Sequence, residues 1–165
     1  MKVIIKCKLY NNLNLSNSYF VHRDFHLQNL MKVKKNIGVI DSQDALIGNP
    51  AYDLVSIIDD VRIKTSLKLK KKIYNYYLKK NSRISLKNQS KFLEDFNTLS
   101  IQRNLKIIGI FSRLFKRDKK KKYLNYIPYT WKLIERRMNS KVFLELRNIL
   151  DNNIPKKVRK KIFNK

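Results

Sequence analysis

The chain has 165 residues, of which 43% are hydrophobic and 11% aromatic, and its formal net charge is +26. The length is that of one domain with a real core, and the apolar content excludes disorder throughout the chain. The charge is compatible with a nucleic acid, an anionic membrane or a phosphate-rich ligand as partner. A compositional bias is the simpler interpretation, because Lys, Asn and Ile are frequent everywhere, including in expected turns.

Cysteine content and hydropathy exclude several further classes of protein. Cys7 is the only cysteine, so the sequence has neither an intrachain disulfide framework nor a cysteine-based zinc site. No apolar run approaches the roughly 20 residues that span a bilayer. The first eight residues are too short and too charged for a signal peptide. The expected location is therefore the cytoplasm, with no transmembrane segment.

The first half of the chain is predicted to contain short strands. Residues 1–10 could include the end of a helix, and the polar residues 11–18 predict a loop. Residues 19–21 are predicted to form a strand. Residues 30–33 and 37–40 are predicted to form a hairpin that turns at 34–36.

The remainder of the chain is predicted to be helical. Gly48 and Pro50 predict a turn over residues 46–50, and apolar recurrence predicts a helix over 51–62 with Asp53 in its first turn. The same recurrence predicts helices over residues 66–80, 88–115, 123–137 and 142–150. We expect residues 116–122 to be a charged connector and residues 156–165 to be a mobile basic tail.

Three oxygen-bearing side chains lie around the predicted hairpin. Asp24 could take a proton from a hydroxyl, Asn29 precedes the first strand, and Asp41 follows the second. The hairpin would bring Asn29 close to Asp41, so both could face one cation. Mg²⁺ prefers oxygen ligands and usually takes one or two of them from protein. A base, an Asn and a metal-binding Asp in this order are typical of a kinase catalytic loop.

The motif that contains these residues resembles a known family. It reads His22-Arg23-Asp24-Phe25-His26-Leu27-Gln28-Asn29 and is followed by Ile40-Asp41. This is similar to the His-Gly-Asp-(apolar)-His-x-x-Asn pattern of the aminoglycoside phosphotransferase and choline kinase family, with Arg23 at the usual Gly position. Members share the protein-kinase fold and phosphorylate small molecules. Within this family, the chain most resembles the branch of N-acetylmuramate and N-acetylglucosamine kinases. The segments that carry this resemblance are Gln43-Asp44-Ala45, Gln102-Arg103-Asn104-Leu105 and Gly109-Ile110-Phe111.

The resemblance implies a role for each residue of the motif. Asp24 would be the catalytic base, and Asn29 and Asp41 would bind Mg²⁺, with ATP as the co-substrate. We expect His22 to hold the shape of the loop by hydrogen bonds. We expect Asp53 to accept hydrogen bonds from the loop backbone, although its simpler interpretation is a favourable charge at a helix start.

The acceptor pocket is less well defined by the sequence. His26, Gln43, Asp44 and Arg103 are candidates to line it, and each is equally well interpreted as a structural residue. The resemblance implies an amino sugar acceptor, N-acetylmuramate or N-acetylglucosamine, phosphorylated at its anomeric hydroxyl. Choline, an aminoglycoside and homoserine are the alternative acceptors.

The expected fold is a mostly helical α+β protein, similar to the C-terminal lobe of a protein kinase, over residues 1–155. Residues 20–44 would hold the catalytic loop and metal site, and 51–151 the helical subdomain. The glycine-rich loop of an N-terminal lobe is not expected, because Gly38, Gly48 and Gly109 are the only glycines.

Three explanations fit a chain without that lobe: a truncated gene, a separately encoded N-terminal lobe, or a kinase relic that binds without catalysis. A module that completes a split kinase should expose an apolar patch where the other lobe docks. A non-catalytic nucleic-acid-binding protein is the alternative outside the enzymes. It would have a one-sided basic face, whereas a compositional bias would scatter the charge evenly.

Overall fold

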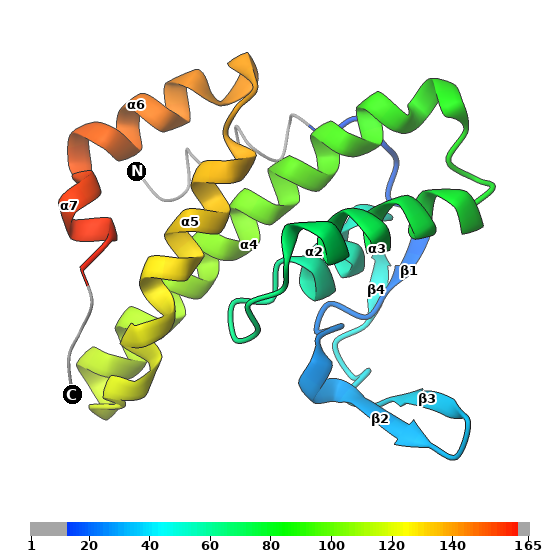
Figure 1. Cartoon of the computed structure of the whole chain (residues 1–165), viewed down its shortest axis with the longest axis horizontal. Helices are drawn as coiled ribbons and strands as arrows, with labels where there is room; N and C mark the ends of the chain where they lie inside the picture. The colour runs from blue at the N-terminus through cyan, green and yellow to red at the C-terminus, as the bar shows by residue number, and fades with distance from the viewer. Residues whose placement is uncertain (1–12, 162–165) are drawn as a thin grey trace. The chain divides into compact units, whose positions relative to one another are not determined.

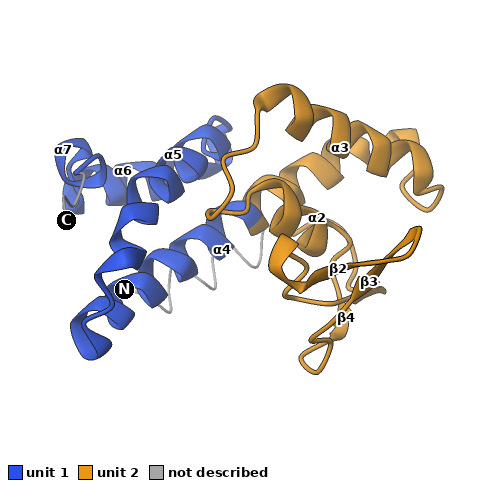
Figure 2. Ribbon diagram, turned by 60° about the horizontal axis from the view of Figure 1, so that its bottom comes forward, with its two compact units in different colours: residues 1–10, 100–165 blue, residues 11–99 orange. Residues whose placement is uncertain are grey.

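The computed structural model describes residues 13–161. The chain divides into two compact units, of residues 11–99 (unit 2) and of residues 1–10 with 100–165 (unit 1), coloured separately in Figure 2. The helix end expected within residues 1–10 lies outside the described residues. Figure 1 shows the order of the elements, with all labelled strands in the first part of the chain.

Unit 2 contains two small antiparallel sheets. Strand β2 (Leu30–Val33) pairs with β3 (Asn36–Val39), and Leu30 lies opposite Val39. This confirms the predicted hairpin, and Lys34 makes the turn with a φ of 54°. Strand β1 (Tyr19–Val21) is also confirmed, but it pairs with β4 (Leu46–Gly48).

The expected turn over residues 46–50 is therefore wrong in its first three residues, which form β4. Gly48 lies opposite Tyr19 in β1. A Cβ at Gly48 would meet side-chain atoms of Leu46 and Val21 at 3.1 Å each. The glycine thus permits a close approach inside a sheet rather than a turn.

The helices of unit 2 are α2 (Ala51–Ile58), α3 (Leu67–Lys80) and the first part of α4 (Gln89–Asp118), with 3-10 turns at Leu27–Asn29 and Leu86–Asn88. Their apolar faces form a core of Ala51, Leu54, Val55, Ile58, Ile84, Phe92, Phe96 and Leu99. Tyr77 stacks on Phe92 with ring centroids 5.7 Å apart. Full burial of each large apolar side chain contributes about 1.5–3 kcal/mol.

Helix α2 ends four residues before the predicted end at residue 62, because two buried carboxylates follow it. Asp59 and Asp60 are buried. The Lys70 ammonium donates to the Ile58 carbonyl and lies 2.9 Å from Asp59 Oδ1. This ion pair occupies a last-turn carbonyl of the helix, which intrahelical hydrogen bonds leave free.

Unit 1 contains the rest of α4, followed by α5 (Ile127–Arg137), α6 (Leu144–Asn153) and α7 (Lys156–Arg159), with 3-10 turns at Lys121–Tyr126 and Lys141–Phe143. The charged connector expected over residues 116–122 is wrong, since α4 continues to Asp118 and the 3-10 turn begins at Lys121. Pro128 lies in the first turn of α5, where its missing N–H is tolerated.

The mobile tail expected from residue 156 is wrong over the part that the structure describes. Residues 156–159 form α7, and Arg159 is only 1% exposed. Its guanidinium donates to Asp151, Glu135 and the Ile154 carbonyl, and it lies 4.9 Å from the Trp131 ring. These contacts hold a segment that its lysine content alone predicts to be solvated.

The structure is mostly helical with a small β part, as expected for an α+β protein. Among residues 13–161, no helix has the length and apolar character needed to cross a membrane.

Candidate active site

The segment predicted to be the catalytic loop, residues 22–29, lies in unit 2 between β1 and β2. His22 is buried at its start, whereas the Asp24 side chain is exposed. Arg23 between them has a φ of 71°, in the left-handed region. This conformation reverses the chain between a buried and an exposed residue, and it explains why glycine suits this position.

Asp53, in the first turn of α2, holds the start of the loop. Its Oδ2 accepts a hydrogen bond from the His22 N–H at 2.7 Å, and its Oδ1 accepts one from the Arg23 N–H at 3.0 Å. These are the hydrogen bonds expected for Asp53 from the sequence. One carboxylate thereby satisfies two consecutive loop donors across 30 residues of chain.

Burial raises the pKa of the Asp53 carboxyl. The two backbone hydrogen bonds from His22 and Arg23 act in the opposite direction, because they favour the charged carboxylate, but desolvation is the larger effect.

The loop and the hairpin are joined by hydrogen bonds around Asn29. Asn29 Nδ2 donates to the Asp24 carbonyl at 3.0 Å, and the Ile40 N–H donates to the Asn29 carbonyl at 3.0 Å. The side-chain amide nitrogen of Asn29 is thus engaged by the loop. Its Oδ1 has no partner among the described residues and remains available as a ligand.

Asp41 follows Ile40 directly, so the hairpin places it beside Asn29. Its side chain is exposed, and its φ of 64° is again left-handed. His22 Nε2 lies 3.0 Å from the Ile40 carbonyl. Because a carbonyl only accepts, Nε2 carries the proton in this contact, and His22 supports the residue that precedes Asp41.

The donor set of the hairpin fits a hard cation. Within residues 13–161, no group of three or more His, Cys, Asp or Glu side chains could hold a metal. Asn29 and Asp41 offer two oxygen ligands, which matches Mg²⁺ because this ion takes its other ligands from phosphates and water. The residues therefore fit Mg²⁺ bound together with a phosphate ligand.

The acceptor candidates are distributed over both units. His26 is partly buried in the catalytic loop, and Gln43 and Asp44 are exposed after Asp41. The Asp44 carbonyl accepts a hydrogen bond from Arg23 Nη1 at 3.2 Å, which ties this segment to the loop. Arg103 belongs to the part of α4 in unit 1 and is buried, whereas the other three candidates belong to unit 2.

Asp95 joins two segments that flank the strands of unit 2, and its role was not predicted from the sequence. It is fully buried in α4 and accepts hydrogen bonds from the Asn14 and Leu15 N–H groups, before β1, and from Asn49 Nδ2, before α2. The available signal was a carboxylate directly before Phe96, on the apolar side of the predicted helix.

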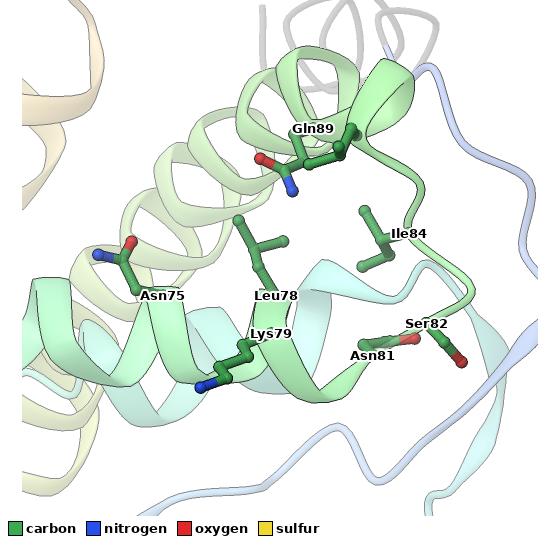
Figure 3. A pocket seen from close by; sticks show the side chains of 8 residues that line it. Asn75, Leu78, Lys79, Asn81, Ser82, Ile84 and Gln89 are labelled. Atoms are coloured by element: carbon green, nitrogen blue, oxygen red, sulfur yellow. The ribbon is translucent and has the colours of Figure 1, made fainter.

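A surface pocket of about 440 Å³ lies elsewhere in unit 2, at the end of α3 and the start of α4 (Figure 3). Its lining comprises Asn75, Leu78, Lys79, Asn81, Ser82, Ile84, Leu86 and Gln89. None of the catalytic-loop residues lines it, so the pocket is not the candidate active site.

Comparisons with known proteins agree with this geometry. Residues 9–84 match the phosphotransferase enzyme family. The chain is 40% identical over 112 residues to the N-acetylmuramate/N-acetylglucosamine kinase of Neisseria meningitidis, covering 66% of this chain and 34% of the relative. It is 37% identical over 120 residues to the protein of the same name from Pseudomonas aeruginosa, covering 70% and 35%.

A protein of the same name from Caulobacter vibrioides is 29% identical over 146 residues, covering 86% of this chain and 39% of the relative. The chain thus spans between a third and two fifths of the length of these relatives. Both the family match and the names of the relatives agree with the resemblance that the catalytic-loop motif indicated. Over residues 9–84 the chain is therefore similar to the phosphotransferase enzyme family.

Proposed function

We propose that the chain contributes the catalytic half of an ATP- and Mg²⁺-dependent small-molecule kinase. The observation that carries this proposal is the hydrogen-bonded unit of loop and hairpin, in which Asn29 links the Asp24 carbonyl to the residue before Asp41. The best supported acceptor is an amino sugar, N-acetylmuramate or N-acetylglucosamine, because the similar proteins carry these names.

Asp24 acts as the catalytic base in this proposal. Its exposed carboxylate makes no hydrogen bond to the described residues, while its carbonyl accepts hydrogen bonds from the His26 N–H and from Asn29 Nδ2. The backbone is thus fixed and the carboxylate is free to bind the acceptor hydroxyl. Asp24 orients the hydroxyl toward the γ-phosphate of ATP and takes its proton as the new P–O bond forms, while the bond from the γ-phosphorus to the bridging oxygen breaks and ADP leaves. Positioning supplies much of the rate enhancement in such a transfer.

Asn29 and Asp41 hold Mg²⁺ in the proposed site. When bound there, Mg²⁺ would supply charge neutralisation to the ATP phosphates. Asp53 and His22 position these ligands indirectly: Asp53 fixes the start of the loop, and His22 supports the Ile40 carbonyl.

In kinases of this fold, a glycine-rich loop of an N-terminal lobe covers the ATP phosphates. We propose that such a lobe docks on the strands of unit 2. Phe20 in β1 and Ile47 in β4 form a cross-strand pair, with 67% and 63% of their surfaces exposed. The β2–β3 hairpin exposes apolar residues on both faces, Met31 and Val33 on one and Ile37 and Val39 on the other. We call these six residues the apolar β surface. Exposed apolar area of this kind marks an interaction site.

The proposed function can be tested by completing the enzyme. This chain would be fused to the part of the Pseudomonas aeruginosa relative that it does not span, and product formation would be followed by ³¹P NMR with ATP and Mg²⁺. The panel of acceptors is N-acetylmuramate, N-acetylglucosamine, choline, an aminoglycoside and homoserine. We expect phosphorylation of the two amino sugars and little turnover by the unfused chain. A folded fusion that phosphorylates no acceptor would contradict the proposed kinase function. Phosphorylation of a different acceptor would contradict the proposed substrate.

The acceptor candidates are tested in the same fusion. If His26, Gln43, Asp44 or Arg103 binds the sugar, its replacement by Ala should raise KM for the sugar more than KM for ATP. Equal effects on both values would assign that residue to the structure rather than to the acceptor pocket.

A further inference from the structure

One continuous part of unit 2 carries cations without carboxylates. Between Val61 and Leu93 the sequence contains no Asp or Glu. It contains eleven basic residues, which are Arg62, Lys64, Lys68, Lys70, Lys71, Lys72, Lys79, Lys80, Arg83, Lys87 and Lys91. The positive charge of this segment is therefore not compensated by acidic residues within it. All eight Asp and Glu residues of unit 2 lie in the rest of that unit.

Almost all of these cations face solvent. Lys70 is buried in its pair with Asp59, and Arg62 lies near Asp60. The other nine are exposed, and within residues 13–161 none of them forms an ion pair with a carboxylate. Exposed and unpaired cations in one segment produce a positive potential that attracts polyanions.

Helix α3 arranges part of this charge in a row. Lys68, Lys72 and Lys79 are spaced by four and seven residues, so they lie on one side of the helix. The opposite side, with Ile73, Tyr74 and Tyr77, packs toward the core of unit 2. From Lys68 to Lys79 the helix rises about 16 Å. One strand with the phosphate spacing of B-DNA carries about five phosphate charges over that length, so one helix face can meet several phosphates.

The apolar side chains of α3 do not favour a membrane as the partner. An interfacial helix turns a continuous apolar face toward the lipid. In α3 the side opposite the core is occupied by the lysine row, and Leu67 and Leu69 lie on either side of that row. The surface is thus suited to phosphates and does not offer an apolar face for insertion.

Aromatic and amide groups next to the row favour nucleic acid. Tyr76 is 63% exposed, with Lys80 Nζ 5.9 Å from its ring centroid. The pocket of Figure 3 adjoins the end of the row, with Lys79 in its lining. Asn75, Asn81 and Gln89 provide amide donors and acceptors around Leu78 and Ile84. Stacking on an aromatic ring and amide contacts to base edges are the means by which proteins bind unpaired bases.

We propose that the surface formed by α3 and the following pocket binds single-stranded nucleic acid. The row of Lys68, Lys72 and Lys79 contacts successive phosphates, Tyr76 stacks on a base, and the pocket receives a neighbouring base. This function is independent of the proposed kinase chemistry, since none of these residues belongs to the catalytic loop or the hairpin.

The experiment measures binding of a fluorescein-labelled 12-nucleotide oligo(U) by anisotropy, from 50 to 300 mM KCl, with the chain as it stands. The test variant is Lys68→Gln/Lys72→Gln/Lys79→Gln. The control, Lys156→Gln/Lys157→Gln/Lys160→Gln, removes the same charge from exposed positions in unit 1. Circular dichroism verifies that both variants fold.

We expect the test variant to bind at least tenfold more weakly than the wild type. Its slope of log K against log salt should be smaller in magnitude by about 2, since three phosphate contacts to a single strand are lost. The control should change affinity by less than threefold. Tyr76→Ala should weaken binding severalfold with an unchanged salt slope, because it removes stacking and no charge.

Three results would overturn the proposal. Equal losses in the test and control variants would show that net charge alone drives binding. Absence of binding by the wild type at 50 mM KCl would exclude the interaction. Binding to vesicles with 30% phosphatidylserine that is lost in the test variant, without oligo(U) binding, would assign the surface to a membrane instead.

Discussion

At the scale of single residues, the catalytic loop combines backbone strain with hydrogen bonds that compensate for it. Arg23 and Asp41 are non-glycine residues with positive φ, at the two ends of the candidate site. Such residues persist where the surrounding structure fixes them. Here the Asp53 carboxylate fixes Arg23, and the Ile40–Asn29 hydrogen bond fixes the residue before Asp41.

The strain at Arg23 gives a stability prediction. Arg23→Gly should leave the free energy of unfolding within about 1 kcal/mol of wild type, because relief of the left-handed conformation offsets the greater entropy of the unfolded glycine. The free energy of unfolding of Arg23→Val should be about 1–2 kcal/mol lower than that of Arg23→Gly, since a β-branched residue tolerates positive φ poorly. Urea denaturation measures both values. Equal stabilities of the Gly and Val variants would contradict the assigned backbone conformation.

The half-buried Asp53 gives a pH prediction. Because burial raises its pKa in the folded state, the unfolded chain loses this proton at lower pH than the folded chain does. The free energy of unfolding of the wild type, relative to Asp53→Asn, should therefore fall as pH rises from the ordinary carboxyl pKa to the raised pKa of Asp53. Urea denaturation between pH 3.5 and 7 tests this. A rise over the same range would mean that the two backbone hydrogen bonds outweigh desolvation.

The loop residues could be predicted from the sequence because they form one local motif, from His22 to Asn29. Asp95 could not be assigned its role, since its partners Asn14 and Asn49 are 81 and 46 residues away. Patterns in a single sequence indicate local spacing. A hydrogen bond between distant residues is visible there only as a polar residue at a position where an apolar one is expected.

At the scale of elements, periodicity predicted α3, the long α4 and the β2–β3 hairpin well. The errors concern tertiary contacts that override local signals. Gly48 and Pro50 indicated a turn, but pairing with β1 makes residues 46–48 a strand. The lysines after residue 155 indicated a solvated tail, but Arg159 has buried partners that its neighbours do not reveal.

The ion pair after α2 gives a prediction for an element boundary. Lys70→Met should lower the free energy of unfolding by about 3–5 kcal/mol, because it leaves Asp59 buried without its cation. Lys71→Met is the matched control, since the neighbouring lysine is exposed, and should change it by about 0.5 kcal/mol or less. Similar stabilities of the two variants in urea would show that the pair does not stabilise the end of α2.

At the scale of the whole molecule, the division into two units is not marked in the sequence, because α4 runs through the boundary at residue 100. The apolar β surface comprises one cross-strand pair, Phe20 and Ile47, and four residues on the two faces of the β2–β3 hairpin. Docking of a separate lobe on these strands stays a prediction.

The apolar β surface gives a prediction for the unfused chain. Phe20→Thr/Ile47→Thr should at least halve the fluorescence of a bound hydrophobic dye and reduce self-association in sedimentation, with an unchanged circular dichroism spectrum. The reason is that both side chains are exposed and contribute little to the core. Leu67→Thr/Leu86→Thr, at exposed positions outside the strands, is the control and should retain most of the dye signal. Equal effects of the two pairs would contradict a specific docking surface.

The most direct test of the kinase account is single-turnover transfer from ATP to N-acetylglucosamine by the fused enzyme, with and without Asp24→Asn. Asp118→Asn, on the unit 1 part of α4, is the matched control. We predict that Asp24→Asn lowers the rate at least 100-fold while ATP affinity stays within threefold, because general-base catalysis contributes about 10²–10⁴. Asp118→Asn should retain the full rate. A rate for Asp24→Asn equal to that of Asp118→Asn would show that Asp24 is not the catalytic base.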